Sequence, residues 1–533
     1  MENVFLLTMV VLVYLFMIAF LGYYGYRKTN NALDYLVAGR NTHPAVMALS
    51  YGATFISTSA IVGFGGVAAM MGMGLLWLTF LNIFIGIIIA FIFFGKRTRK
   101  MGHNLDAHTF PELLGKRYQS RFVQGFAGLV IFIFMPLYSA AVLIGAARFL
   151  ETTFPNMLNF NVAVLIYALI ICAYVFAGGI KGVMYTDALQ GAIMFVGMLI
   201  LLVMCYANLG GVTAAHQALT AIADKVPEKL AAQGHLGWTR MPALGSPLWW
   251  TMVSTIVMGV GIGVLTQPQL AVRFMTVKSN KEINRGVVTG GIFILMMTGV
   301  AYIVGSLSNV YFLRNPKFGQ IALNLTQGNV DKIMPLYINN AMPTWFVYVF
   351  MLTLLSAAMS TSSSQFHAMG TAFGRDLFEK IFLKGKGSKH TVLLTRVGIL
   401  VGVLITVILG FKLPTSIIAI ATAMFFGLCA STFLPAYAGA LFWKGMTKTG
   451  AIASMFAGFI VTGLWFLFVH KKESEALGLC QLLFQKPTLA TFPWTVVDPI
   501  MIALPISLVV AVVVSVCTTR LPKNHIEACF KYF

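Results

Sequence analysis

The sequence is poor in charge and lacks the marks of several protein classes. Charged residues make up 10% of its 533 residues, whereas a soluble protein carries roughly 25%. Most of the six cysteines lie in apolar segments, so no disulfide framework is expected. The apolar segments contain no recognisable pair of nucleophile and base and no cluster of metal ligands, so an enzyme is not expected either.

The charge that is present is mainly positive. The 37 Lys and Arg against 16 Asp and Glu give a net charge of +21, which by itself would suit a nucleic-acid-binding protein. The basic residues instead fall mainly in alternate loops between apolar stretches, most densely in the loop 95–119. Basic loops of membrane proteins face the cytoplasm. We therefore expect the N-terminus outside the cell and the C-terminus inside.

Apolar stretches recur along the whole chain. Hydrophobic residues account for 58% of it and the mean hydropathy is +0.84. Many stretches reach the roughly 20 residues that cross a bilayer core. The first has no basic segment before it and no cleavage site after it, so it is interpreted as a retained helix. The sequence predicts an all-α multi-pass protein of the plasma (cell inner) membrane with about thirteen transmembrane helices. Their expected ranges are 4–24, 45–71, 75–94, 123–150, 162–176, 185–208, 248–274, 286–311, 345–373, 392–410, 416–441, 450–469 and 499–516.

The stretch 345–373 contains a run of hydroxyl side chains. Ala357, Ser360, Thr361 and Ser364 fall at i, i+3, i+4 and i+7, which is one face of a helix. Several oxygen ligands on one face suit a hard cation such as sodium, by the logic of calcium and magnesium sites. Small and hydroxyl residues also occur where membrane helices pack closely, so close packing is the alternative.

Asp187 is an exception among the acidic residues, nearly all of which fall in loops or at helix ends. It begins a long apolar stretch, and a carboxylate in a membrane is costly and usually functional. Facing a cavity, Asp187 could hold a cation; at the membrane interface, it would pair with Lys181. The hydroxyl run in 345–373 favours the cation.

Two apolar stretches carry residues that favour unwinding. Gly and Pro lower the free energy of interrupting a helix, and paired interruptions in two repeats mark the binding site of a transporter. Glycine and proline are also simply common in membrane helices. The residues concerned are Gly52, Gly63, Gly65 and Gly66 in the second stretch, and Gly259, Gly261, Gly263, Gln267 and Pro268 in the seventh.

Matching positions in the second and seventh helices would make helices 2–6 and 7–11 two five-helix repeats. The whole chain, 1–533, would then be one membrane domain. It would consist of a first helix and loop (1–44), a first repeat (45–246), a second repeat (247–449) and two peripheral helices with the tail (450–533).

Several groups of residues form longer motifs. They are Gly178-Gly179 with Tyr185-Thr186-Asp187 and Gln190, Ala357-Ala358-Met359-Ser360-Thr361, Gln267-Pro268-Gln269 with Arg273-Phe274, and Phe442-Trp443-Lys444 with Gly450-Ala451. Together they resemble the sodium:solute symporter family from Asp34 to about Gly458. Gly445 departs from the pattern, because the family often has a second basic residue there. The resemblance implies a LeuT-type fold of inverted repeats and sodium-coupled transport of a small solute.

The resemblance also implies a sodium site between the second and ninth helices. Matched residue by residue, its ligands would be the backbone carbonyls of Ala53, Ile56 and Ala357 and the hydroxyls of Ser360 and Thr361. Some members of the family have a second sodium site. This chain has Asp187, Ser363 and Ser364 at the matching positions, which leaves a stoichiometry of two sodium ions open. Sodium is the expected coupling ion, and no organic cofactor is expected.

The sequence says less about the solute. Stretches such as 117–121 and 145–152 look most like the sodium/pantothenate symporters. Arg148 near a helix end could attract a carboxylate, although Glu151 is a ready partner. We expect pantothenate or a monocarboxylate, with proline or another amino acid as the alternative. Candidates for the pocket are Thr54, Phe55, Ser57, Thr58, Asn82, Arg148, Val260, Val264 and Gln267.

These features predict a secondary active transporter that carries a small organic solute with sodium by alternating access, working as a monomer. Proton coupling through Asp187 is an alternative. A sensor or channel on the same scaffold is less expected, because no appended soluble domain is recognisable at either end of the sequence.

Overall fold

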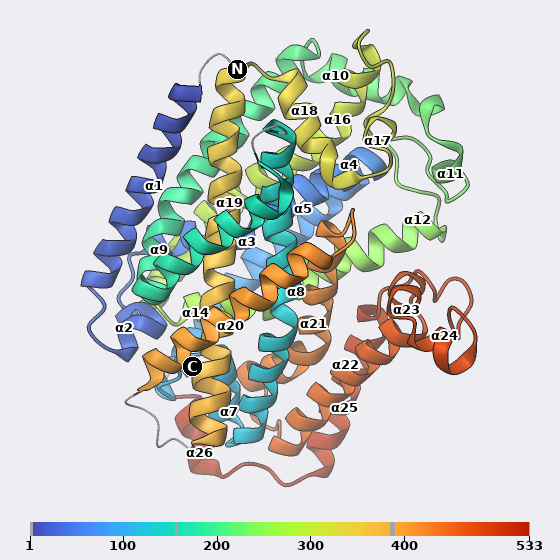
Figure 1. Cartoon of the computed structure of the whole chain (residues 1–533). Helices are drawn as coiled ribbons and strands as arrows, with labels where there is room; N and C mark the ends of the chain where they lie inside the picture. Colours follow the sequence, from blue (N-terminus) through green and yellow to red (C-terminus); the bar gives the residue numbers. More distant parts are fainter. Residues whose placement is uncertain (1–3, 155–157, 384–389, 532–533) are drawn as a thin grey trace.

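The computed structural model describes residues 4–154, 158–383 and 390–531, and every regular element in these ranges is helical (Figure 1), as expected. Eleven helices in this part of the chain are long and apolar enough to cross a membrane, and several of them contain π-helical or 3-10 turns. They are α1 (Val4–Arg27), η3 to α6 (Met73–Leu75, Leu76–Ile83, Phe84–Gly95, Lys96–Asn104), α8 (Arg121–Thr153), α9 (Phe160–Asn208), α12 to η7 (Pro247–Trp250, Thr251–Val260, Gly261–Gly263, Val264–Thr266), α15 to α16 (Asn280–Ile294, Leu295–Gly299, Val300–Arg314), α19 with η10 (Thr344–Thr371, Ala372–Phe382), α20 (Thr391–Lys412), α21 (Ile418–Phe442), α22 (Lys448–Phe468) and α25 (Ile500–Cys517).

A twelfth span is broken. Helix α3 (Pro44–Phe55) meets the segment formed by η2 (Ser59–Gly63) and α4 (Phe64–Met71) at a bend of 49°. Ile56 follows α3 with extended backbone angles, φ −94° and ψ 106°. The glycines expected to unwind this helix lie on either side of the break and not in it. Gly66 instead allows close packing, because a Cβ at this position would lie 2.0 Å from the carbonyl oxygen of Val330.

Two further interruptions position the site. Gln267 is extended, with φ −69° and ψ 115°, and Pro268 begins α14 (Pro268–Phe274), where its missing N–H is tolerated. Helix α9 is non-helical at Gly179, where φ is 55°. As one straight helix its 49 residues would extend about 74 Å, more than twice a bilayer core. The two spans expected at 162–176 and 185–208 both lie in α9, which explains why thirteen spans were expected and eleven or twelve are counted.

Short helices cover both ends of the bundle, and the chain begins at one end and finishes at the other (Figure 1). One end carries α2 (Ala32–Val37), η1 (Ala38–Arg40), α7 (Phe110–Arg117) and α26 (Lys523–Cys529). The other carries α10 (Val212–Ala221), η5 (Ala223–Lys225), α11 (Glu228–Ala231), α17 (Ala322–Leu325), η9 (Val330–Lys332) and α18 (Ile333–Ala341). Beside α22 lie α23 (Lys471–Leu477) and α24 (Leu479–Phe484).

Helix α19 forms the centre of the protein. It packs against α9, α8, α20 and α3, whereas α1 and the pair α22 and α25 lie at opposite edges (Figure 1). Every residue of α19 from Thr353 to Thr371 is buried. The hydroxyl run of this helix therefore faces protein and not lipid, which is where polar side chains in a membrane are tolerated.

Close helix packing gives a first test. A Cβ on Gly305 of α16 would lie 2.1 Å from the carbonyl oxygen of Gly65, so Gly305→Ala must push two backbones apart. Overpacking of this kind costs about 1–3 kcal/mol. We expect a lower melting temperature of the purified protein in detergent. Gly291→Ala in α15 is the control, because a Cβ there meets nothing within 4 Å; equal melting temperatures for the two variants would contradict this packing.

Candidate functional site

The break after Phe55 leaves backbone carbonyls of α3 without helical partners, and hydroxyls of α19 lie against them. Ser360 Oγ donates to the carbonyl oxygen of Ala53 at 2.8 Å and lies 3.4 Å from that of Ala357. Thr361 Oγ1 lies 3.4 Å from the carbonyl oxygen of Ala53 and 3.5 Å from that of Ile56. All five residues expected at the sodium site are buried and joined by these contacts.

The chemistry of these five oxygens fits a sodium ion. Ligand oxygens about 2.4 Å from a hard cation lie about 3.4 Å apart when they are adjacent in an octahedron. The contacts between hydroxyl and carbonyl oxygens in the set run from 2.8 to 3.5 Å. The set contains oxygen alone and carries no charge, which suits a monovalent ion. Among the described residues, no group of three or more His, Cys, Asp or Glu could hold a metal.

A charged cluster lies directly beside these oxygens. Asp187 of α9 is fully buried, and its Oδ2 lies 2.8 Å from Nη2 of Arg273 in α14. Nη2 also donates to the hydroxyls of Thr54 and Ser364, both at 2.6 Å. Ser363 Oγ lies 3.4 Å from Oδ1 of Asp187. The three residues expected at a second sodium site are thus brought together, with an arginine among them.

The alternative prediction, in which Asp187 pairs with Lys181, is wrong. Lys181 pairs with another acid, because its ammonium lies 2.9 Å from a carboxylate oxygen of Asp34. The sequence singled out Arg273 only as part of a family motif. The signal that could have found its role is a basic residue directly after the predicted interruption at Gln267 and Pro268, in a stretch that is otherwise apolar.

A small cavity lies beside the break in α3. None of its lining residues is charged, and several are aromatic. Asn82 faces this cavity, and its Oδ1 is buried without a hydrogen-bond partner in the described part of the chain. The lining residues are Phe55, Ile56, Ser57, Ala60, Phe64, Asn82, Tyr138, Val260, Thr298, Tyr302, Thr422 and Phe426.

Four of the nine pocket candidates line this cavity: Phe55, Ser57, Asn82 and Val260. The other five are used elsewhere. Thr54 belongs to the Asp187 cluster, Thr58 donates to the carbonyl oxygen of Val142, and Gln267 donates to that of Gly263. Val264 packs beside Gly86. Arg148 pairs with Glu151 at 2.8 Å and lies 4.2 Å over the ring of Phe160, so it is not in the cavity.

The sequence did not single out the residues that α8, α16 and α21 contribute to the wall of this cavity. Tyr138 lies two residues after Pro136 in an apolar helix, and Thr298 and Thr422 are isolated hydroxyls in apolar stretches. An isolated polar residue in such a stretch is a weak signal, because membrane helices contain many hydroxyls that bond their own backbone. Thr298 and Thr422 both make such bonds here.

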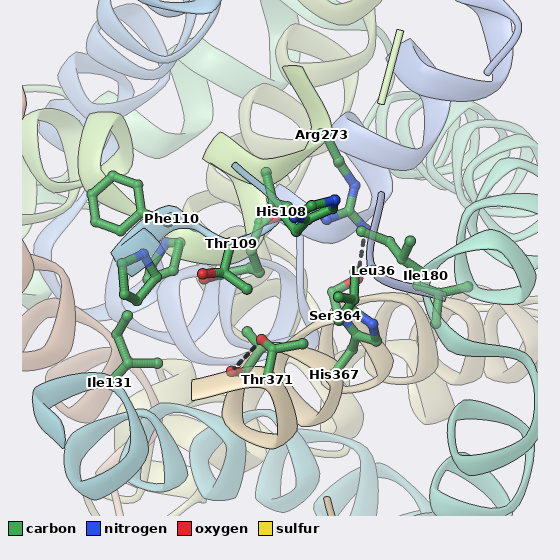
Figure 2. A pocket seen from close by; sticks show the side chains of 16 residues that line it. Leu36, His108, Thr109, Phe110, Ile131, Ile180, Arg273, Ser364, His367 and Thr371 are labelled. Atoms are coloured by element: carbon green, nitrogen blue, oxygen red, sulfur yellow. Dashed lines mark hydrogen bonds between the residues drawn. The ribbon is translucent and has the colours of Figure 1, made fainter. Parts of the chain in front are cut away.

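A second small cavity lies on the other side of the charged cluster. In Figure 2, Arg273 and Ser364 are joined by a hydrogen bond at its wall, and His367, Thr109 and Phe110 also line it. Beyond Thr109, a buried ion pair joins Glu112 of α7 to Arg375 of η10 at 2.9 Å. Burial alone would raise the pKa of Glu112, but His108, Arg375 and Lys116 hold that pKa well below its ordinary value.

The chain matches known proteins over most of its length. A model of the sodium:solute symporter family matches residues 35–458. The osmoregulated proline transporter OpuE of Bacillus subtilis (strain 168) is 26% identical over 456 residues, which cover 85% of this chain and 87% of that protein. The sodium/proline symporter of Escherichia coli (strain K12) is 26% identical over 475 residues, which cover 88% of each protein.

Solved structures share the architecture. A Na+-coupled sialic acid symporter in a substrate-bound outward-open state aligns with a TM-score of 0.75 at 18% identity, covering 97% of this chain and 99% of that one. Mhp1, a nucleobase-cation-symport-1 family transporter in a closed conformation, aligns with a TM-score of 0.50 at 13% identity, covering 94% and 98%. At these identities the likeness shows the fold alone, which is LeuT-type.

These comparisons correct the expected subgroup. The relatives described above are named for proline and not for pantothenate. The stretches that suggested pantothenate symporters lie largely in loops and at helix ends, away from the cavity beside the break, so they carry little information about the solute. The family is unaffected by this correction, since its model covers four fifths of the sequence. The chain belongs to the sodium:solute symporter family.

Proposed function

We propose that this transporter carries a small amino acid, with proline as the first candidate, into the cell together with sodium by alternating access. One observation carries the proposal: Ile56 belongs to both sites. Its carbonyl oxygen is one of the five oxygens of the sodium set, and the same residue lines the cavity beside the break. A cation and a solute therefore meet at a single interruption of one helix.

Coupling follows from this shared position. Sodium bound between α3 and α19 would hold the residues of the break in one arrangement, and that arrangement shapes the wall of the solute cavity. If both ligands favour the same conformation, each raises the affinity of the protein for the other by the same factor. Neither ligand alone would then drive the full conformational change from the outward-facing to the inward-facing state.

The cavity suits an amino acid better than a monocarboxylate. The amide of Asn82 can accept a hydrogen bond from a protonated amine and donate one to a carboxylate, and an amino acid carries both groups. The aromatic walls, among them Tyr138 and Phe426, favour a cationic amine and an apolar ring. Arg148, which the sequence offered as one candidate to attract a carboxylate, lies outside the cavity and pairs with Glu151. The names of the relatives agree with this choice.

We place the end of the bundle that carries α6, α7 and α26 in the cytoplasm. The basic residues of α6, which are Lys96, Arg97, Arg99 and Lys100, lie in this region, and positive loops remain inside. The protein then lies in the plasma membrane, with its N-terminus outside the cell. We also propose that the protein works as a monomer.

Removing the hydroxyl ligands tests the sodium site. Ser360→Ala and Thr361→Ala should each raise the sodium concentration for half-maximal proline uptake roughly 10- to 150-fold, because losing one ligand of a charged group costs about 1.5–3 kcal/mol. Uptake is measured in proteoliposomes with radiolabelled proline. Ser356→Ala is the control on the same helix, since its hydroxyl bonds Tyr14 and no residue of the sodium set.

Two results would overturn this assignment. One is an unchanged sodium dependence in both hydroxyl variants. The other is full uptake by the unaltered protein in sodium-free buffer under an imposed pH gradient, which would establish proton coupling instead.

Competition tests the class of solute. We expect unlabelled proline to block the uptake of labelled proline completely, and pantothenate and a short monocarboxylate such as propionate to leave it nearly unchanged at the same concentration. The reason is the unpaired acceptor and uncharged wall of the cavity. If pantothenate competes better than proline, the solute assignment is wrong, while the sodium assignment stands.

Asn82 provides a separate test. Asn82→Ala removes one hydrogen bond to the solute, worth about 0.5–1.5 kcal/mol, and should raise the KM for proline roughly 2- to 12-fold at saturating sodium. Thr79→Ala is the matched control in α5 (Leu76–Ile83), because its hydroxyl is also buried without a partner in the described residues but lies outside the cavity. A KM that changes equally in both variants would exclude a contact between Asn82 and the solute.

A further inference from the structure

The segment between α22 and α25 folds into a hairpin that exposes apolar side chains. Its two short helices differ in character, because α23 begins with Lys471, Lys472 and Glu473, whereas α24 has the sequence Leu-Cys-Gln-Leu-Leu-Phe. Seven large apolar side chains, which we call the apolar edge, have between 45% and 77% of their area exposed. They are Leu477, Leu482, Leu483, Phe484, Leu489, Phe492 and Trp494. Exposed apolar surface of this kind marks contact with a membrane or with another protein.

The hairpin is fixed against the last turns of α22. The N–H of Leu489 donates to the carbonyl oxygen of Phe468 at 2.8 Å, and the ring of Phe484 lies 5.8 Å from the ring of Phe468. The rings of Trp494 and Trp465 lie 6.0 Å apart. Trp465 and Phe468 belong to a helix that is long and apolar enough to cross a membrane. The apolar edge therefore lies at the depth where this helix leaves the hydrocarbon core.

This depth is at the outer surface in the orientation proposed above. Helix α22 starts at Lys448, shortly after Trp443, whose carbonyl oxygen accepts a hydrogen bond from Arg117 of α7 at 3.2 Å. Helix α7 lies at the end of the bundle that we place in the cytoplasm. The 21 residues of α22 extend about 32 Å, close to the thickness of a bilayer core. The end of α22 that carries the hairpin thus meets the outer leaflet.

The surface next to the hairpin faces lipid. Helix α22 exposes Ile460 and Leu464, and α25 exposes Leu508, Val509 and Val512. These two helices pack against each other at one edge of the bundle, and α23 and α24 extend from that edge away from α19 (Figure 1). The apolar edge therefore continues a lipid-facing surface and does not cover the centre of the protein.

We propose that the hairpin 471–498 is an interfacial anchor, with its apolar edge inserted into the outer leaflet of the bilayer. Lipid is the occupant because the apolar edge is attached to the last turns of a membrane-spanning helix and continues the lipid-facing surface of α22 and α25. The charged start of α23 remains in water, since Lys471, Lys472 and Glu475 are exposed. The inference goes beyond the proposed function, because it holds for any ion and any solute.

Fluorescence quenching tests the position of the apolar edge in the intact protein. Leu482→Cys replaces its most exposed member and is labelled with a nitrobenzoxadiazole dye after reconstitution into phosphatidylcholine vesicles. The background is Cys517→Ser, because Cys517 is exposed and the other five cysteines are buried. Lys472→Cys is the matched control, since this residue is exposed on α23 of the same hairpin.

The two dyes should respond oppositely to two quenchers. Phosphatidylcholine with a nitroxide on its acyl chain should quench the dye at position 482, at a depth of about 5–10 Å below the headgroups, as for other interfacial helices. Iodide in the buffer should quench the dye at position 472 and leave the dye at position 482 nearly unchanged. The melting temperature of each labelled protein should equal that of the unlabelled background, because both sites are exposed.

A charged variant tests the cause of insertion. The dye is moved to position 492 by Phe492→Cys, and Leu482→Asp with Leu483→Asp then places two charges on α24. Charged side chains are costly in hydrocarbon, so the nitroxide lipid should quench this dye less and iodide should quench it more. Unchanged quenching in the charged variant would contradict the role of the apolar edge.

Three other results would overturn the inference. Quenching of position 482 by iodide and not by the nitroxide lipid would place the apolar edge in water. Protection from both quenchers would mean that protein covers it, for example a second copy of this chain. Equal quenching at positions 472 and 482 would show that the dye, and not the sequence of the hairpin, determines the depth.

Discussion

The carbonyl groups exposed where α3 ends at Phe55 are the constraint on which the rest of the site depends. Inside a bilayer, each backbone group without a partner costs several kcal/mol, so an interruption is tolerated only where protein or a cavity supplies one. Here Ser360 and Thr361 supply hydroxyls to the carbonyls of Ala53 and Thr54. A cation can take over the same oxygens, because a hydroxyl that donates to a carbonyl still has lone pairs to offer. The carbonyls at the break therefore have partners in this structure, and the same oxygens are available to the proposed sodium ion.

That constraint explains which parts of the site follow from the sequence. The hydroxyl face of α19 is a local pattern at helical spacing, so the sequence alone predicted a cation site there, and the structure places Ser360 and Thr361 against the carbonyls of α3. The glycines around the break in α3 were a misleading local pattern, since glycine serves both unwinding and close packing. In this protein Gly66 and Gly305 serve packing, and the break falls at Ile56, where no glycine lies.

Long-range pairing accounts for what the sequence did not show. Arg273 and Asp187 are 86 residues apart, and their side chains meet because α14 and α9 both pack against α3. The solute cavity is similar, because Tyr138 and Thr422 come from helices far from α3 in the chain. The fold class and the membrane-spanning segments depend on hydropathy, which is local, so they were predictable. The walls of the cavity depend on which helices are neighbours, which a single sequence does not specify.

Two buried carboxylates near the cavities are already paired with arginines. Asp187 is balanced by Arg273, and Glu112 is balanced by Arg375 at the far side of the second cavity. The solute cavity has no charged side chain, and the sodium set is neutral. A sodium ion at that set would then bring an unbalanced positive charge next to the solute cavity. The carboxylate of an amino acid is the group that can offset this charge, and in a medium of low dielectric the attraction is strong. Under the proposed function, ion and solute would stabilise each other because Asp187 and Glu112 are already paired with arginines.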